Sequence, residues 1–124
     1  MERINAEGAP AAVGPYSHAI RSGNLIFCSG AIPLCPETSE IVGDEVAGQT
    51  EQVFNNMAAV LKSQGIGLGD VVKTTVFLQS MGDFGTMNEV YAKRFGDHKP
   101  ARSTVEVSKL PLGVLVEIEC IAEV

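Results

Sequence analysis

Residues 114–124, VLVEIECIAEV, carry the pattern that decides the fold. Successive side chains of a β-strand point to opposite faces of the sheet, so an alternating pattern gives the strand two different faces. One face is apolar and consists of Val116, Ile118, Cys120 and Ala122. The other is mainly acidic, with Glu117, Glu119 and Glu123 interrupted by Leu115 and Ile121. A strand of this kind needs a layer of helices on its apolar face only.

Residues 102–107 form a second predicted strand just before it, and a turn through Pro111 and Gly113 joins the two. This turn favours an antiparallel hairpin between them. Ser103, Val105 and Val107 alternate in this strand with Arg102, Thr104 and Glu106. The hairpin predicts one polar sheet face, away from the helices, that carries Arg102, Thr104, Glu106, Glu117 and Glu119. Such a face is either the solvated side of an antiparallel sheet or a site in which a guanidinium binds an anion beside a carboxylate base.

Two helices are predicted upstream. The first runs over residues 45–64 after Asp44 as its cap and ends before Gly65. Its apolar stripe at three- and four-residue steps consists of Val46, Thr50, Val53, Met57 and Leu61. The second follows Asp83, ends at Gly96 and turns one face inward, with Phe84, Met87, Tyr91 and Phe95.

Three further strands complete the prediction, at residues 16–21, 25–29 and 71–79. The first two form a hairpin through the turn at residues 22–24. The order β-β-α-β-α-β-β indicates an α+β fold in which one mixed sheet carries two helices packed on one face. At 124 residues the chain has the length of a single domain, residues 1–124.

Composition limits the functional classes. The chain is 45% hydrophobic and only 19% charged, so it is typical of a folded domain and favours burial of surface between subunits. The net charge of −6 and the lack of any basic run argue against nucleic acid. The longest uncharged stretch, residues 22–36, is too short to cross a bilayer. The first seven residues have no signal-peptide pattern, and three unpaired cysteines (Cys28, Cys35 and Cys120) indicate a reduced, cytoplasmic protein.

Motifs along nearly the whole chain match one pattern. They are Gly14-Pro15-Tyr16-Ser17, Cys28-Ser29-Gly30-Ala31-Ile32-Pro33, Gln49-Thr50-Glu51-Gln52, Lys73-Thr74-Thr75-Val76-Phe77-Leu78, Asp83-Phe84 with Asn88 and Tyr91, Pro100-Ala101-Arg102-Ser103, Val105-Glu106-Val107, Leu110-Pro111 and Glu117-Ile118-Glu119. The most specific are the Pro-Ala-Arg-Ser segment and the paired glutamates. In the order and spacing of these motifs the chain resembles the RidA/YjgF family of enamine/imine deaminases. The resemblance implies a bacillus chorismate mutase-like fold and a homotrimer with sites between subunits.

The same resemblance implies an activity and its residues. Family members hydrolyse reactive 2-imino acids, such as 2-iminopropanoate and 2-iminobutanoate, to 2-keto acids and ammonia without a metal or cofactor. Arg102 then clamps the substrate carboxylate and Glu117 positions the attacking water. Tyr16, Ser29, Gly30, Asn88 and Thr104 are the implied substrate-binding residues.

The chain departs from the usual family pattern at Thr104, Ala31 and His18, where Cys, Gln, and Gln or Pro are common. Thr104 offers no thiolate, so water rather than a side chain has to attack the imine. Ala31 enlarges the wall beside Ser29 and bears on the size of the substrate. His18 and His98 lack ligand-like spacing, which argues against a metal site.

Two other functions remain open. One is a non-catalytic binder of small carboxylates on the same trimeric scaffold, and the other is an RNA-acting protein. The acidic balance disfavours RNA. Glu117 favours the enzyme, because a mere binder of a carboxylate gains nothing from a second negative charge beside its ligand.

Overall fold

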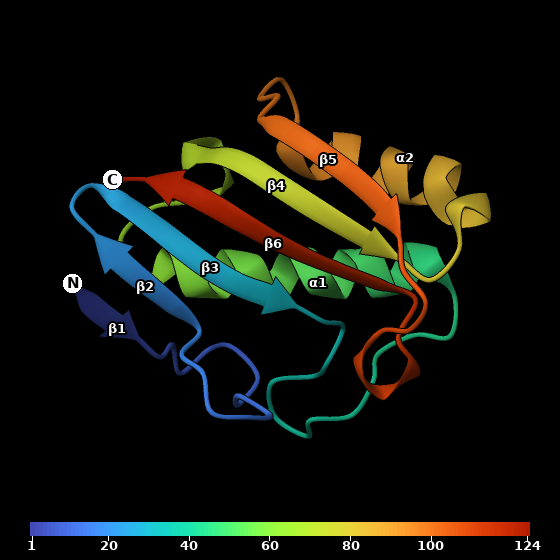
Figure 1. Ribbon diagram of the computed structural model, residues 1–124, viewed down its shortest axis with the longest axis horizontal. Helices are drawn as coiled ribbons and strands as arrows, with labels where there is room; N and C mark the ends of the chain where they lie inside the picture. Colours follow the sequence, from blue (N-terminus) through green and yellow to red (C-terminus); the bar gives the residue numbers. More distant parts are fainter.

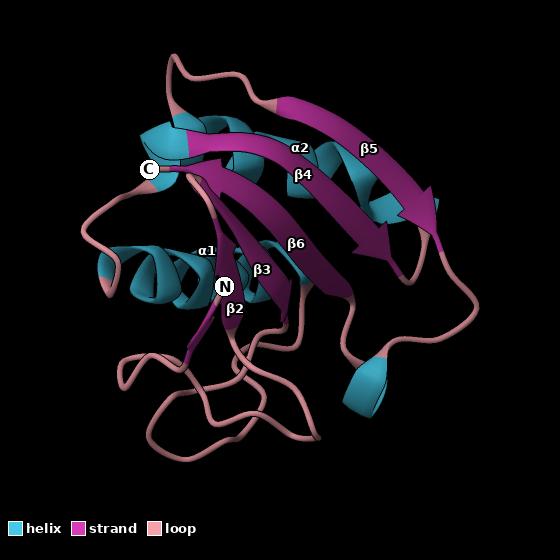
Figure 2. Ribbon diagram, turned by 60° about the vertical axis from the view of Figure 1, so that its left-hand side comes forward, coloured by secondary structure: helices cyan, strands magenta, loops and turns pink.

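The computed structural model describes residues 1–124 as one mixed six-stranded sheet with two helices on one of its faces (Figures 1 and 2). The strands are β1 (Glu2–Ile4), β2 (Ala19–Ser22), β3 (Leu25–Ala31), β4 (Val71–Leu78), β5 (Ala101–Glu106) and β6 (Val116–Glu123). The helices are α1 (Val46–Lys62) and α2 (Phe84–Phe95), with short 3₁₀ turns at Leu68–Asp70, Met81–Asp83 and Pro111–Gly113. The predicted fold class, with its two helices on one sheet face, is therefore confirmed.

The strands lie in the order β1-β2-β3-β6-β4-β5, so the last strand of the chain sits in the middle of the sheet. Only β4 and β5 are parallel, and every other neighbouring pair is antiparallel. A parallel pair needs a crossover connection, which α2 supplies between β4 and β5. After this crossover, β5 lies at the edge of the sheet, next to β4.

The predicted hairpin of residues 102–107 with residues 114–124 is wrong, because β4 lies between β5 and β6. In β4, Val76 stands opposite Thr104 of β5 and opposite Ile118 of β6. Residues opposite one another in neighbouring strands share a face. Phe77 likewise stands opposite Val105 and Glu117.

The predicted common polar face is therefore also wrong. The strand register places three of its five residues, Arg102, Thr104 and Glu106, on the helix-covered face of the sheet. The other two, Glu117 and Glu119, lie on the opposite face, which no helix covers (Figure 2). We call this uncovered side the open face. Alternation within each strand is as predicted, but alternation does not specify which strand is the neighbour.

The core lies between the sheet and the helices. The apolar residues predicted for β6 are all buried there, as is the predicted stripe of α1, Val46, Thr50, Val53, Met57 and Leu61. Phe54 on α1 packs edge-on against Tyr91 and Phe95 of α2, with ring centroids 5.6 and 5.4 Å away. The burial of the stripe confirms the predicted face of α1, the burial of Met87, Tyr91 and Phe95 confirms that of α2, and the ring contacts hold the two helices side by side.

The ends of the elements differ in detail from the prediction. Helix α1 begins after Glu45 without a side-chain cap, so Asp44 does not cap it; Gln49 instead donates to the carbonyl of Gly43. Gly96 ends α2 with a positive φ of 64°, a conformation that favours glycine. Neither helix is long and apolar enough to cross a membrane.

The segment before β2 is a loop and not the predicted start of a strand. The strand β2 begins at Ala19, three residues later than expected, and Tyr16 is 46% exposed. Residues 5–18, which we call the lead-in, fold over the end of the sheet (Figure 1). His18 holds them there, because its ring bonds the backbone of both Ala6 and Pro10.

Candidate functional site

The predicted site residues fall into two groups on opposite sides of the sheet. The first, which we call the arginine group, consists of Arg102 and Thr104 on β5 with Asn88 on α2. The second, which we call the glutamate pocket, is lined by Val13, Tyr16, Ser29, Gly30, Ile32, Pro111 and Glu117. Each group has its own geometry.

Arg102 is held from two sides. Its Nη1 donates to Asn88 Oδ1 at 2.6 Å, and its guanidinium lies 4.7 Å from the ring centroid of Tyr91 and 5.5 Å from that of Phe84. An arginine stacked in this way keeps its planar fork in one orientation. Arg102 forms no ion pair, since Arg94 with Glu51 is the only salt bridge in the molecule. The remaining N–H groups are therefore available to an anionic ligand.

Helix α2 supplies this support because Phe84, Asn88 and Tyr91 recur at four- and three-residue steps and so share one helix face. Tyr91 also bonds Thr74 on β4 at 2.7 Å between the two hydroxyls, which ties the helix to the sheet. Burial raises the pKa of Tyr91, so its phenol stays neutral at physiological pH. The sequence pattern places Phe84 and Tyr91 on the buried face of the second predicted helix and gives them no role beside Arg102. Their four- and three-residue spacing from Asn88 is the signal that could have indicated this role.

Thr104 lies two residues after Arg102 on the same face of β5. Its Oγ1 is buried and has no hydrogen-bond partner within the chain. A buried hydroxyl without a partner is uncommon in folded proteins and costs about 1–3 kcal/mol. Glu106, further along the same strand, already has a partner, because its carboxylate accepts a hydrogen bond from the backbone N–H of Met81 at 2.8 Å.

Glu117 is the one charged side chain in the wall of the glutamate pocket. Burial raises its pKa, and the negative charge of Glu119 on the same face raises it further. A carboxyl group whose pKa is raised towards neutrality is able both to accept a proton and to return it. This is the property required of a general base that later acts as an acid.

Gly30 gives the Glu117 carboxylate its place. A Cβ atom on residue 30 would fall 1.9 Å from Glu117 Oε2, far inside van der Waals contact. Only glycine therefore allows the carboxylate to lie against the backbone of β3 in this position. The neighbouring Ser29 donates from its hydroxyl to the carbonyl of Ser17 at 2.7 Å, and the Tyr16 hydroxyl accepts from the N–H of Val13 at 3.3 Å.

Four of the predicted residues, Tyr16, Ser29, Gly30 and Glu117, thus share the glutamate pocket, and Asn88, Arg102 and Thr104 form the arginine group. The structure does not bring the two groups together within one chain. Val13, Ile32 and Pro111 line the pocket and were missed. Val13 and Ile32 sit beside predicted residues, but only the fold shows that Pro111 reaches the same place.

No group of three or more His, Cys, Asp or Glu side chains is arranged to hold a metal ion. His18 and His98 each donate to or accept from the backbone, His98 through its Nε2 and the carbonyl of Val71. The three cysteines are free.

Comparison with known proteins gives the family. The family model described as Endoribonuclease L-PSP matches residues 6–124. The chain is 54% identical over 121 residues to a RutC family protein of Pyrococcus horikoshii, covering 98% of this chain and 96% of that protein. It is 47% identical over 122 residues to the 2-iminobutanoate/2-iminopropanoate deaminase of Escherichia coli, covering 96% and 94% of the two chains.

Solved structures agree in fold. The structure of Escherichia coli TdcF with bound serine superposes with a TM-score of 0.94 at 41% identity and covers 100% of this chain and 99% of that one. The chain therefore belongs to the RidA/YjgF/RutC family and has its chorismate mutase-like fold.

Proposed function

We propose that this protein hydrolyses small 2-imino acids and their enamine forms, including 2-aminoacrylate/2-iminopropanoate and 2-iminobutanoate, to 2-keto acids and ammonia. In this proposal Arg102 of one copy binds the substrate carboxylate, and Glu117 of a second copy positions and deprotonates water. The observation that carries the proposal is the division of the site. A fixed guanidinium without a counter-ion lies on one side of the sheet, and a carboxyl with a raised pKa lies in a pocket on the other.

The chemistry follows from these two groups. A planar guanidinium binds a carboxylate bidentately and so fixes the adjacent C=N carbon. Glu117 takes a proton from water as the water oxygen attacks that carbon, and the C=N double bond becomes a C–N single bond. Glu117 returns that proton to nitrogen, which gives a carbinolamine. It then moves the proton of the carbinolamine hydroxyl to nitrogen as the C–N bond breaks, so that ammonia leaves and the C=O of the 2-keto acid remains. One C–O bond forms and one C–N bond breaks without a change in oxidation state, so the reaction needs no redox cofactor.

Two relatives support this proposal. The Escherichia coli protein at 47% identity is named 2-iminobutanoate/2-iminopropanoate deaminase. The Escherichia coli TdcF structure contains serine, which carries nitrogen and a carboxylate on one carbon as a 2-imino acid does. Thr104 contributes its unpaired hydroxyl beside Arg102 as a further hydrogen-bonding group for the substrate.

We also propose a homotrimer in the cytoplasm. In this trimer each copy presents its arginine group to one neighbour and its glutamate pocket to the other. Such a contact is head-to-tail, and when the rotation from one copy to the next closes after three copies, it forms a ring with three equivalent sites. The open face of the sheet carries large apolar side chains that subunit contact would cover, among them Phe27 and Val105, each 42% exposed.

Release of ammonia and 2-keto acid from freshly generated 2-aminoacrylate, with and without the protein, tests the proposed reaction. Acceleration over the spontaneous hydrolysis supports it. Binding of pyruvate without any acceleration supports the alternative, a non-catalytic carboxylate-binding regulator on the same scaffold. The net charge of −6 gives no support for an RNA substrate.

A further inference from the structure

A second cavity adjoins the glutamate pocket. It lies behind Gly30, between the lead-in, the end of β3 and helix α1, and has a volume of about 50 Å³. That is room for roughly four water-sized groups. The cavity shares five lining residues with the glutamate pocket: Val13, Tyr16, Ser29, Gly30 and Ile32. The two spaces are therefore separated by the same short wall, and a molecule held at Glu117 lies next to the second cavity.

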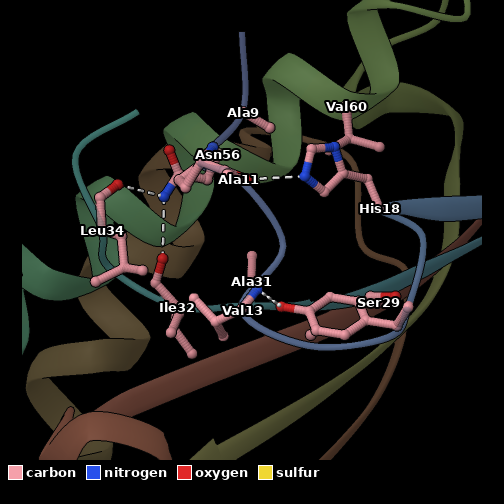
Figure 3. Close-up of a pocket in the computed structure, with 13 residues that line it drawn as sticks. Ala9, Ala11, Val13, His18, Ser29, Ala31, Ile32, Leu34, Asn56 and Val60 are labelled. Carbon is pink, nitrogen blue, oxygen red and sulfur yellow. Dashed lines mark hydrogen bonds between the residues drawn. The ribbon is translucent and has the colours of Figure 1, made fainter. Parts of the chain in front are cut away.

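Small and aliphatic side chains form most of this cavity. Figure 3 shows Ala9 and Ala11 from the lead-in, Val60 from α1, and Ala31 at the end of β3 around it. No Asp, Glu, Lys or Arg lines it. The space exists because residue 31 ends in a methyl group at this point. A longer side chain on Ala31 would project from the same wall and fill it.

The polar side chains in the wall already have partners. His18 accepts the N–H of Ala6 at Nδ1 at 2.9 Å, and its Nε2 donates to the carbonyl of Pro10 at 2.7 Å. Asn56 donates to the carbonyls of Ile32 and Leu34 (Figure 3). Its Oδ1 accepts from Gln52.

Among the side chains of the wall, the hydroxyl of Tyr16 is the one that keeps an unused donor, and no charged side chain faces the cavity. A charged or strongly polar ligand group would therefore lose most of its water contacts without replacing them, which costs free energy. An aliphatic group loses nothing by leaving water and gains dispersion contacts. The cavity favours apolar occupants by its chemistry as well as by its shape.

We propose that this cavity receives the aliphatic side chain of the substrate and that Ala31 sets the upper limit on the size of the 2-imino acids that the protein accepts. The inference rests on the proposed function, because it assigns a substrate class to the same site. A 2-imino acid has only three substituents on its reacting carbon. With the carboxylate on Arg102 and the C=N group facing Glu117, the side chain is the one that remains for the adjoining apolar space.

The test compares two substrates in three proteins. The imines of leucine and alanine are generated in situ by an amino acid oxidase, and kcat/KM for 2-keto acid release is measured for each. We expect the parent to hydrolyse both imines. In Ala31→Leu the ratio of kcat/KM for the leucine imine to that for the alanine imine should fall by roughly 10- to 200-fold. The control Ala58→Leu makes the same change on α1 at a residue that lines neither cavity and should leave the ratio unchanged.

An unchanged ratio in Ala31→Leu overturns the proposal, as does a parent protein that hydrolyses only the alanine imine. In the latter case the proposed deaminase function stands. If Ala31→Leu does not fold, Ala31→Val makes the smaller change, and the same fall in the ratio is expected on a smaller scale. If the parent hydrolyses neither imine, the proposed function fails, and binding decides the cavity separately. Calorimetry with 4-methyl-2-oxopentanoate and pyruvate should then show selective loss of the larger keto acid in the variant, and equal affinities would overturn the cavity assignment.

Discussion

At the scale of single residues, Arg102 is a cation without an anionic partner that is held in one orientation. Its orientation comes from Asn88 and from the faces of Tyr91 and Phe84, so its ligand meets a preformed fork. We expect Arg102→Ala to lower kcat/KM for the alanine imine by about 10²-fold or more, since a charge-assisted contact is lost. Arg102→Lys should be nearly as poor, because a point charge does not reproduce the bidentate geometry.

Steady-state kinetics check this prediction, with Arg21→Lys, a distant arginine, as the matched control. Near-parental turnover in Arg102→Lys would show that the fork is unnecessary. Near-parental turnover in Arg102→Ala would remove Arg102 from the site.

We expect Glu117 to act as the base that takes a proton from the attacking water. Glu117→Gln keeps the shape of the side chain and removes the base, so we expect turnover to fall by roughly 10²–10⁴-fold. Binding of pyruvate, measured by calorimetry, should be as tight as in the parent or tighter, because a negative charge beside the ligand is gone. Equal turnover in the variant would reduce Glu117 to a structural residue.

The raised pKa of Glu117 also has a consequence for stability. The folded chain binds this proton more tightly than the unfolded chain, so the free energy of unfolding falls as pH rises through the interval between the unfolded pKa, about 4.3, and the higher folded value. Glu117→Gln lacks this loss. The free energy of unfolding in urea should therefore be higher for the variant than for the parent at pH 7, and the difference should be absent at pH 3.

Gly30 illustrates how a residue without a side chain positions one that has chemistry. In Gly30→Ala the new Cβ would meet Glu117 Oε2 at 1.9 Å, so the carboxylate must move. The end of a glutamate is flexible, and the fold should persist while kcat falls by about 10²-fold. Gly48→Ala on α1, where nothing lies near the added methyl, is the control and should keep full activity.

Because both changes act through one carboxylate, Gly30→Ala should add little further loss in the Glu117→Gln background. Additive losses in the double variant would show that the added methyl group disturbs the backbone of the substrate pocket and does not act through Glu117.

At the scale of elements, the lead-in depends on His18 for its place. The Ala6 N–H that donates to the ring belongs to a buried residue, so His18→Ala should cost about 1–3 kcal/mol of unfolding free energy. His18→Gln offers an amide oxygen to Ala6 and an N–H to Pro10 and should recover most of the loss. Chemical unfolding measures the stability, and faster hydrogen exchange at Ala6 locates the change. Equal stability of His18→Ala and the parent would mean that the lead-in is held by packing alone.

The elements themselves were largely predictable, and their neighbours were not. The alternation of Val116 to Ala122 and the stripe on α1 depend on local periodicity, which the sequence contains. The pairing of residues 102–107 with 114–124 depended on proximity along the chain, and the fold inserts β4 between them. This insertion reverses the face on which Arg102 lies relative to Glu117.

The same reasoning explains which parts of the candidate site the sequence could reveal. Arg102 and Glu117 stand out in the alternating pattern of their strands, but their separate roles came from the family resemblance. Tyr16, Ser29 and Asn88 were named through that resemblance alone, because polar residues from distant segments have no local signal. The stacking of Tyr91 and Phe84 on Arg102 and the place of Pro111 beside Glu117 arise only from tertiary packing. The separation of the two groups also appears only once the sheet order is known.

At the scale of the whole molecule, this separation makes a prediction about assembly. One chain carries both groups but on opposite sides of its sheet, so the proposed reaction predicts a site that combines Arg102 from one copy with Glu117 from another. Sedimentation should give about three times 13.1 kDa for the proposed trimer. A monomer that is stable and fully active would contradict a site between copies.

Mixing two inactive variants tests the shared site more directly. Arg102→Ala keeps an intact glutamate pocket, and Glu117→Gln keeps an intact arginine group. In a closed ring assembled at random from equal amounts of both, a site is native when an arginine from the Glu117→Gln copy meets a glutamate from the Arg102→Ala copy. That combination occurs at about a quarter of the sites, so co-refolded mixtures should recover about a quarter of parental activity. A mixture of Arg102→Ala with Arg102→Lys contains no such combination and should stay inactive. If the site lay within one chain, neither mixture would recover activity, because every copy would still carry its own defect.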